Sequence, residues 1–392
     1  MSNNSVVIAG AKRTAIGSML GQFTGVPTPT LGATAIRAAL EQAGIASSDV
    51  SEVFMGCVLP ANLGQAPARQ ASLAAGIPKS VPCTTINKVC GSGMKAIMLG
   101  HDLIKAGSAS IVVAGGMESM TNAPHMVAAR TGLRYGDAKM VDHMAWDGLT
   151  NPYDGQSMGV FADATAEKHG FTREQQDAYT IESVNRAKAA TASGAFADEI
   201  VAVKVAGKKG DVEYATDEQP AKSDVSKIPT LRRAFNKNGT VTAASSSSIS
   251  DGAAATVLLS EEEANKRGLK PLARIVAHAT QAQEPEWFTT APVGALESVL
   301  KKAGWSVADV DVFEINEAFA VVAMTPMKVL GIPHEKLNVH GGACALGHPI
   351  GASGARLVVT LINALKKKGG KRGVATLCIG GGEATALAIE LV

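Results

Sequence analysis

The alternation of apolar and polar residues predicts helices that alternate with short strands, and one such unit occurs twice. In the first copy, a helical stretch ends with a glycine at residues 40–44, and the apolar run 53–56 follows after a turn. The second copy has the same order, with a helix end at 300–304 and an apolar run at 312–316. Glycine after a helical stretch is typical of a helix C-terminus, and a short apolar run is typical of a strand. The copies lie 260 residues apart (300 minus 40), which favours a duplication.

The correspondence continues into a second helix and strand. A helix opens at 92–93 before the apolar run 111–114, and another opens at 353–354 before the run 374–377. Chance similarity is the alternative, because helix–strand units are common. Their order and near-constant offset favour a real repeat, which predicts an α/β fold with two similar layered halves.

The repeat divides the chain into domains. We expect residues 1–119 to form the first part of an N-terminal half and residues 270–392 to form a C-terminal half. Residues 120–249 differ in character and are predicted to be an inserted loop domain. From it the chain returns to the first half at about 240–270.

The inserted segment contains one clear helix signal. Thr172 and Gln175 have the spacing of a capping box, which predicts a helix from about Arg173 to Ala192. The stretch 204–237 is polar and rich in lysine. Long insertions of this kind usually bind ligands.

Composition is that of a soluble protein with two or three domains. Of 392 residues, 46% are hydrophobic and only 18% are charged, and the formal net charge is +2. This charge excludes the basic excess of a nucleic-acid-binding protein. Glycine is over-used, with 41 residues, which indicates special backbone positions and close approaches.

Cysteine usage and apolar runs bear on the compartment. The five cysteines form no C-x-x-C pair, which argues against a disulfide scaffold or zinc ribbon and favours a reducing compartment. The N-terminus lacks the apolar segment of a signal peptide. The longest uncharged run, 337–355, contains histidines, glycines and a proline, so we expect no spanning helix. We predict a cytoplasmic protein with neither nucleic acid nor membrane as partner.

Cys90 is the first candidate for chemistry. It stands between a strand-like run and a helix, beside Gly91 and Gly93. A thiol at a helix N-terminus is exposed to the positive end of the dipole, which favours the thiolate. The alternative is an inert buried cysteine. The same stretch fits G-x-G-x-x-A, but the acidic residue expected about 20 positions on in a dinucleotide site is absent.

A second candidate is His348. His340, Cys344 and His348 are four residues apart, as on a metal-binding helix face, but glycines and Pro349 make a continuous helix improbable there. We therefore predict no metal site and favour a loop that holds His348 against a substrate, with a hydrogen-bonded core histidine as the alternative.

Two further residues follow predicted strands. Cys378 ends a strand and precedes Gly380, where exposed backbone N–H groups would make an oxyanion site. Asn316 follows another strand and is either a helix N-cap or a group that orients a water molecule or a substrate oxygen. The lysine-rich run 366–372 suits a phosphate contact or, more simply, the end of a helix.

Together these segments resemble the thiolases over essentially the whole chain. A decarboxylating ketoacyl synthase of the same fold is the enzymatic alternative, but a second histidine would then be expected where Asn316 stands. The non-enzymatic alternative is a relative that has lost catalysis. Such a protein should lack Cys90, His348 or Cys378, and all three are present. The motifs that carry the resemblance are 87–95, 115–120, 250–255, 316–320, 341–354 and 378–382.

The resemblance implies a fold of two similar βαβαβαββ halves that form a layered αβαβα core with an inserted loop domain. It also implies roles at the matching positions. Cys90 would be the acyl-accepting nucleophile and Cys378 the acid/base, while His348 would activate Cys90. Asn316 would hold an oxyanion-binding water, and Gly380 would donate a backbone N–H.

The implied reaction is acyl transfer between coenzyme A thioesters, by condensation of two acetyl-CoA molecules or the reverse thiolysis. The alternative is the broader 3-ketoacyl-CoA thiolase of β-oxidation. Coenzyme A and acyl-CoA would be substrates, with no tightly bound cofactor, and the chain would form a homodimer or homotetramer. The implied coenzyme A contacts are Met158, Phe235, Ser247, Ala318 and Phe319.

Three positions depart from the family pattern. Ser157 stands where relatives specific for acetoacetyl-CoA have histidine, which leaves chain length open. Lys222 stands near the position of a phosphate-binding arginine and is expected to substitute for it. Glu383 follows the glycines after Cys378 and adds a carboxylate near that thiol.

Overall fold

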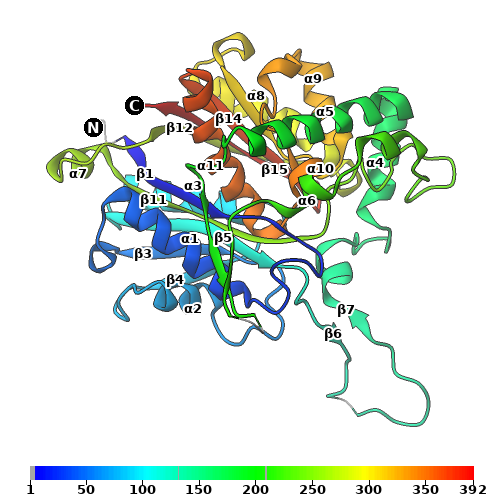
Figure 1. The fold of residues 1–392 in the computed structure, drawn as a ribbon, viewed down its shortest axis with the longest axis horizontal. Coiled ribbons are helices and arrows are strands. Elements are labelled where there is room, and N and C mark those ends of the chain that lie inside the picture. Colours follow the sequence, from blue (N-terminus) through cyan, green and yellow to red (C-terminus); the bar gives the residue numbers. More distant parts are fainter. Residues whose placement is uncertain (1–4, 131, 208–209) are drawn as a thin grey trace.

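The computed structural model describes residues 5–130, 132–207 and 210–392 (Figure 1). Hydrogen bonds join its main strands into one long mixed sheet, with short β2 (Gly17–Ser18) and β8 (Ile200–Val201) at its side. Along the sheet, the order is β13 (Val312–Ile315), β14 (Arg372–Ile379), β15 (Glu383–Leu391), β12 (Ala273–Ala282), β1 (Val6–Thr14), β11 (Ser250–Ser260), β5 (Ile111–Ser119), β3 (Glu52–Gly56), β4 (Cys83–Ile86).

The two ends of this sheet mirror each other about the contact between β1 and β12. That contact consists of only three antiparallel pairs, from Val6↔Ile275 to Ile8↔Ala273. On one side β11 pairs antiparallel with β5, which pairs parallel with β3; on the other, β15 pairs antiparallel with β14, which pairs parallel with β13. Each half thus contributes a matching sheet, and the two sheets join at a narrow seam.

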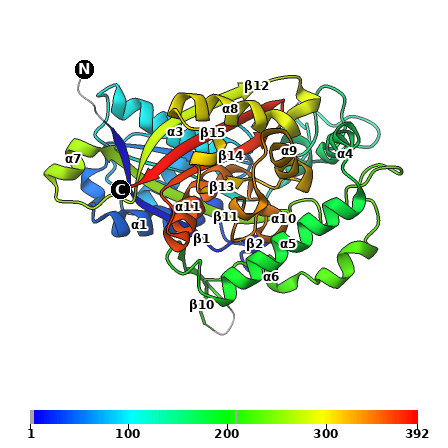
Figure 2. The same ribbon diagram turned by 90° about the horizontal axis from the view of Figure 1, so that it is seen from above.

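Helices form three layers around the two sheets. α3 (Ser92–Lys105) and α11 (Ile350–Lys368) lie between the sheets and contact strands of both. α1 (Thr28–Ala43) and α2 (Pro67–Ala74) cover the outer face of the first sheet, and α8 (Ala291–Ala303) covers that of the second, with α9 (Ala320–Leu330) packed on α8 (Figures 1 and 2). The predicted αβαβα fold class is confirmed.

The middle layer explains part of the glycine excess. Every residue of α11 from Ile350 to Leu365 is buried, as expected for a helix that is enclosed on all sides. A Cβ on Gly354 would lie 2.5 Å from the backbone N of Met94, and one on Gly93 would lie 2.9 Å from the backbone N of Ala355. A Cβ on Gly116 would overlap the carbonyl oxygen of Gly351. These backbones approach too closely for any side chain between them.

The predicted repeat is visible in the structure. α1 ends at Gly44 with φ 65°, and α8 ends at Gly304 with φ 69°, so both helices close with a left-handed glycine. The 3₁₀ turns η1 (Ser47–Asp49) and η5 (Val307–Asp309) then lead into β3 and β13.

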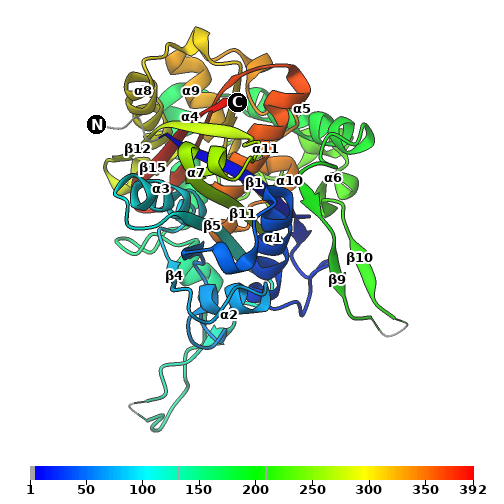
Figure 3. The same ribbon diagram turned by 90° about the vertical axis from the view of Figure 1, so that its left-hand side faces the viewer.

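The segment between β5 and β11 contains further helices and two hairpins. Its helix α5 runs from Arg173 to Ala192 as predicted, and the capping box of Thr172 and Gln175 is formed. Figure 3 shows two hairpin arms extending from the body, β6–β7 and β9–β10. The remaining elements are β6 (His125–Met126), β7 (Val141–Asp142), η2 (Met144–Gly148), α4 (Met158–His169), β9 (Val203–Val205), β10 (Val212–Tyr214), α6 (Glu218–Lys222), η3 (Val225–Thr230), α7 (Glu261–Lys266), η4 (Pro285–Thr290), η6 (His334–Lys336), α10 (Ala343–Leu346).

Two expected helix starts are corrected. α11 begins at Ile350, three residues before the expected Ser353, because Pro349 precedes its first turn. α9 begins at Ala320 with Phe319 as its N-cap residue, so Asn316 is not a helix cap. Among the residues that the structure describes, no helix combines the length and apolar character needed to cross a membrane.

Candidate active site

Cys90 lies in a tight loop between β4 and the start of α3. Val89, just before it, has φ 45°, a left-handed conformation that is costly for a β-branched residue. A Cβ on Gly91, just after it, would overlap the side chain of Ile379. The glycine therefore lets the end of β14, from the other half of the chain, pack directly on this loop.

Cys378 is fully buried on β14, and the glycines that follow it turn back toward Cys90. The backbone N–H of Gly380 lies near the Cys90 thiol, where it acts to lower the pKa of that thiol. Burial raises the pKa of Cys378 well above its usual value, and the neighbouring Cys90 adds to this effect. The two thiols are thus close enough to interact electrostatically, one from each half.

The expectation that Cys90 favours the thiolate is corrected. Burial raises the pKa of the Cys90 thiol to about 11, although N–H groups of Gly380 and of Cys90 itself act to lower it. The N-terminus of α3 therefore stabilises the Cys90 thiolate less than burial destabilises it, and Cys90 is protonated at neutral pH. A base is needed to activate it.

His348 supplies a neutral imidazole. It lies in the turn between α10 and α11, where its Nδ1 is 2.5 Å from the Ser353 hydroxyl oxygen, which in turn donates to the carbonyl oxygen of Pro349. Since the Ser353 proton is used in that bond, Nδ1 carries the imidazole proton and Nε2 has the lone pair, to which an N–H of the Asn316 amide donates. Burial, with Arg356 as a second cause, lowers the pKa of His348 to about 3.

Asn316 lies beside this lone pair, at the end of β13. Its Nδ2 is 3.3 Å from Nε2 of His348, while its Oδ1 is buried without a hydrogen-bond partner among the described residues. The amide oxygen is therefore free to accept a hydrogen bond from a water molecule or a substrate.

Glu317 is a buried residue that sequence reasoning did not identify. Its carboxylate accepts hydrogen bonds from Tyr179 and Ser183 of α5, and from Asn338 and the backbone N–H of Cys344. It fastens the inserted segment to the loops around Asn316 and His348. The feature of the sequence that indicates Glu317 is the presence of a glutamate within an otherwise apolar motif.

One partly open cavity of about 230 Å³ is lined by most of the predicted site residues. Its wall includes Cys90, His348 and Gly380, while Cys378 and Asn316 are fully buried and do not line it. The wall also includes all five residues implied as coenzyme A contacts: Met158, Phe235, Ser247, Ala318 and Phe319.

Lys222 lies outside this cavity. It forms an ion pair with Glu218 (2.5 Å) and lines a neighbouring cavity that shares Ser246 and Ser248 with the first. A second cavity, which shares Phe235, is lined instead by Arg173, Arg232, Arg233 and Lys237. Sequence reasoning did not single out these basic residues, although the lysine-rich stretch 204–237 contains most of them.

The other candidate residues have structural surroundings. His340 packs against Phe196, and Cys344 bonds to Glu317, so with His348 they do not form a ligand set among the described residues. Lys366, Lys367 and Lys368 lie in the last turn of α11. Glu383 forms an ion pair with Lys88, two residues before Cys90.

The fold and the site together define an enzyme whose two cysteines and one histidine lie at the contact between the two related halves of the chain. The thiolase N-terminal domain model matches residues 6–262, and the thiolase C-terminal domain model matches residues 269–391. The chain belongs to the thiolase family.

Named relatives agree with this. The chain is 50% identical over 388 residues to an acetyl-CoA acetyltransferase of Chromobacterium violaceum, which covers 98% of this chain and 99% of that protein. It is 52% identical over 391 residues to acetyl-CoA acetyltransferase 2 of Arabidopsis thaliana, covering 99% and 97%. The crystal structure of Acat5 thiolase from Ascaris suum in complex with coenzyme A matches with a TM-score of 0.95 at 43% identity, covering 99% of this chain and 100% of that chain.

We expect Gly159→Ala to weaken coenzyme A binding. A Cβ at Gly159 would overlap the ring of Phe235, which forms part of the cavity wall and packs edge-on against Phe319. The displaced ring should raise the KM for coenzyme A by about tenfold, or about 1.4 kcal/mol, with a smaller change in kcat. Steady-state kinetics of thiolysis measure this. Val160→Ala, one residue along α4 and outside the cavity wall, is the control, and an unchanged KM in Gly159→Ala would contradict the role of Phe235.

The buried His348 should make the folded state sensitive to acid. Its pKa is about 3 in the folded state and about 6.5 in an unfolded chain, so the unfolded chain takes up the proton first. Stability from this group is full above about pH 6.5 and falls as the pH drops toward 3, by about 2 kcal/mol at pH 5. Urea unfolding at pH 7.5 and pH 5 should show a smaller difference for His348→Asn than for wild type. The exposed His125→Asn should behave as wild type; equal pH dependence in His348→Asn would refute the expectation.

Proposed function

We propose that the chain acts as an acetyl-CoA acetyltransferase, which joins two acetyl-CoA molecules to acetoacetyl-CoA and free coenzyme A or runs the reverse thiolysis. Thiolase activity follows from full-length relatives of that name at about 50% identity, and these favour the acetyl-specific reading over the broader β-oxidation alternative. The observation that carries the mechanism is a single cavity whose wall contains Cys90, His348 and Gly380, with the thiol of Cys378 close enough to Cys90 for each to affect the other electrostatically.

In thiolysis, His348 acts first. Nε2 of His348 takes the Cys90 proton as sulfur attacks the 3-keto carbon, because neither group is charged at rest. The negative oxygen that forms needs preorganised donors, for which the N–H groups near Cys90 and Gly380 and the water held by Asn316 are suited.

Cys378 then provides the proton for carbon–carbon cleavage. Burial keeps this thiol protonated, so it can protonate the departing carbanion and release acetyl-CoA. The imidazolium of His348 then returns its proton to the Cys378 thiolate, so both groups are neutral again. Nε2 of His348 takes the proton of the incoming coenzyme A thiol as that sulfur attacks the acyl group on Cys90, and passes it to the released Cys90 thiolate. This restores the resting site, and condensation follows the same steps in reverse.

The cavity supports short acyl groups as substrates. At about 230 Å³ it is smaller than the roughly 300–1,000 Å³ of typical small-molecule pockets, and Met120, Leu149 and Ile350 close its apolar side. The basic cavity beside Phe235 would take the phosphates of coenzyme A, since arginine pairs well with phosphate oxygens.

The test follows the loss of 3-ketoacyl-CoA absorbance on addition of coenzyme A, for acetoacetyl-CoA and for longer 3-ketoacyl chains. We expect kcat/KM to fall at least tenfold beyond the four-carbon substrate. Equal rates with long chains would favour the broader alternative, and inactivity with every chain length would refute the proposal.

Three expectations remain part of the proposal: a homodimer or homotetramer, a cytoplasmic location, and coenzyme A as a substrate rather than a tightly bound cofactor. Matched halves with exposed apolar residues on the β6–β7 arm, such as Leu133 and Met140, suit a symmetric assembly. A mass from light scattering at several concentrations tests the oligomer, and a monomer would contradict it.

A further inference from the structure

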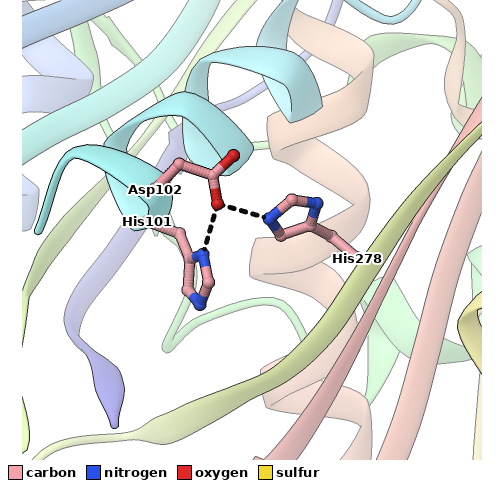
Figure 4. Close-up of side chains that lie close together, drawn as sticks. All are labelled: His101, Asp102 and His278. Carbon is pink, nitrogen blue, oxygen red and sulfur yellow. Dashed lines mark hydrogen bonds and ion pairs between the residues drawn. The ribbon is translucent and has the colours of Figure 1, made fainter. Parts of the chain in front are cut away.

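A cluster of metal-binding side chains lies apart from the active site. His101 and Asp102 project from α3, and His278 projects from β12 toward them (Figure 4). Oδ1 of Asp102 accepts hydrogen bonds from Nδ1 of His101 (2.9 Å) and from Nε2 of His278 (2.8 Å). The two imidazole rings are nearly perpendicular, with centroids 5.0 Å apart.

The cluster is open to solvent and shares no residue with the catalytic cavity. The Asp102 side chain is 53% exposed, while those of His101 and His278 are 12% and 18% exposed. The imidazoles are thus held by packing, and the carboxylate faces water. A fourth ligand could reach the cluster from that side.

The geometry is close to that of a metal coordination shell. Tetrahedral zinc with ligand distances of about 2.0–2.1 Å separates its ligand atoms by roughly 3.3 Å. The two nitrogen–oxygen separations of 2.8 and 2.9 Å need to widen by only about half an ångström to reach this value. Both nitrogens already point at the same carboxylate oxygen, so a cation would replace two protons in an arrangement that exists without it.

We propose that His101, Asp102 and His278 form a site for a divalent transition-metal ion of the zinc class, with water completing the shell. Two imidazoles and one carboxylate are a donor set that zinc, cobalt and nickel accept. The bound ion would bridge α3 of the first half and β12 of the second, near the seam between the two sheets.

Two lysines lie close to the cluster. Lys105, one turn along α3, opposes a cation, while Lys302 donates to the carbonyl oxygen of His278 and fixes the strand there (3.0 Å).

Cobalt is the suitable probe because the chain also contains cysteines. Histidine and carboxylate ligands give weak visible bands, whereas a thiolate adds an intense near-ultraviolet band. Titration of the full-length protein with Co²⁺ at pH 7.5, with equilibrium dialysis for stoichiometry, should show one ion per chain and visible bands without the thiolate band. Zn²⁺ should displace it.

Variants distinguish this site from others. His278→Asn and His101→Asn should each weaken Co²⁺ binding at least tenfold, while His125→Asn, an exposed histidine elsewhere, should bind as wild type. His278→Gln provides a second variant if His278→Asn fails to fold, and thiolase activity measured with a chelator present serves as the folding check. Three results would overturn the proposal. The first is the absence of stoichiometric binding at about 100 micromolar Co²⁺, a concentration on the order of the weakest useful dissociation constant. The others are a thiolate band in the spectrum and unchanged Co²⁺ binding in the histidine variants.

Discussion

Cys90→Ser is expected to abolish acyl-enzyme formation and to lower kcat by at least about 10⁴-fold. Serine keeps the shape of the site, but its hydroxyl is a far weaker acid than the thiol, so His348 cannot activate it at a useful rate. Incubation with radiolabelled acetyl-CoA, followed by peptide mapping, measures the acyl-enzyme directly.

Cys83→Ser is the matched control for this experiment. Cys83 lies on β4, seven residues before the nucleophile, and does not line the active-site cavity. Its variant should be labelled like the wild type. If Cys90→Ser were still labelled on the same peptide, the nucleophile would have been assigned to the wrong residue.

Cys378→Ser should separate the two halves of the reaction. The acyl-enzyme should still form on Cys90, because His348 and the Gly380 N–H are untouched. Condensation and ketoacyl cleavage should fall by about 10²–10⁴-fold, since the carbanion loses its proton partner. Labelling with acetyl-CoA and the absorbance assay, run on the same preparation, measure the two steps separately.

The expected signature is therefore a labelled but inactive enzyme. Loss of labelling in Cys378→Ser would show that this thiol is also needed for acylation, against the division of roles. Retention of full condensation activity would show that another group carries the proton. Cys83→Ser again controls for the loss of a thiol as such.

Local signals explain how much of the fold was predictable. Helix-closing glycines at 44 and 304 are required by a left-handed backbone, and the Thr172 capping box depends on neighbours three residues apart. Such features are encoded within a few residues, so the sequence alone predicts the repeat and the bounds of α5. The start of α11 is a difference of three residues, because the helix begins directly after Pro349 and not at Ser353.

The structure brings most of the predicted site residues to one cavity, but the electrostatics of that cavity do not follow from the sequence. The glycines around Cys90 and Cys378 indicated close approach, yet the pKa of Cys90 depends on burial by the opposite half, which no local pattern records. The same holds for Lys222, which pairs with Glu218 instead of lining the cavity with Phe235. The sequence allows Asn316 to be a helix cap or an orienting group, and the start of α9 at Ala320 excludes the cap.

The close contact between α3 and α11 limits which substitutions this sequence can accept during evolution. A side chain added at Gly93 or Gly354 meets backbone atoms of the facing helix, and one added at Gly116 meets the carbonyl of Gly351. When the obstacle is a side chain, a smaller partner can compensate; when it is a main-chain atom, no partner substitution removes it. We therefore expect these positions to lack compensating pairs among descendants of this sequence, while the outer helices exchange residues in matched sets.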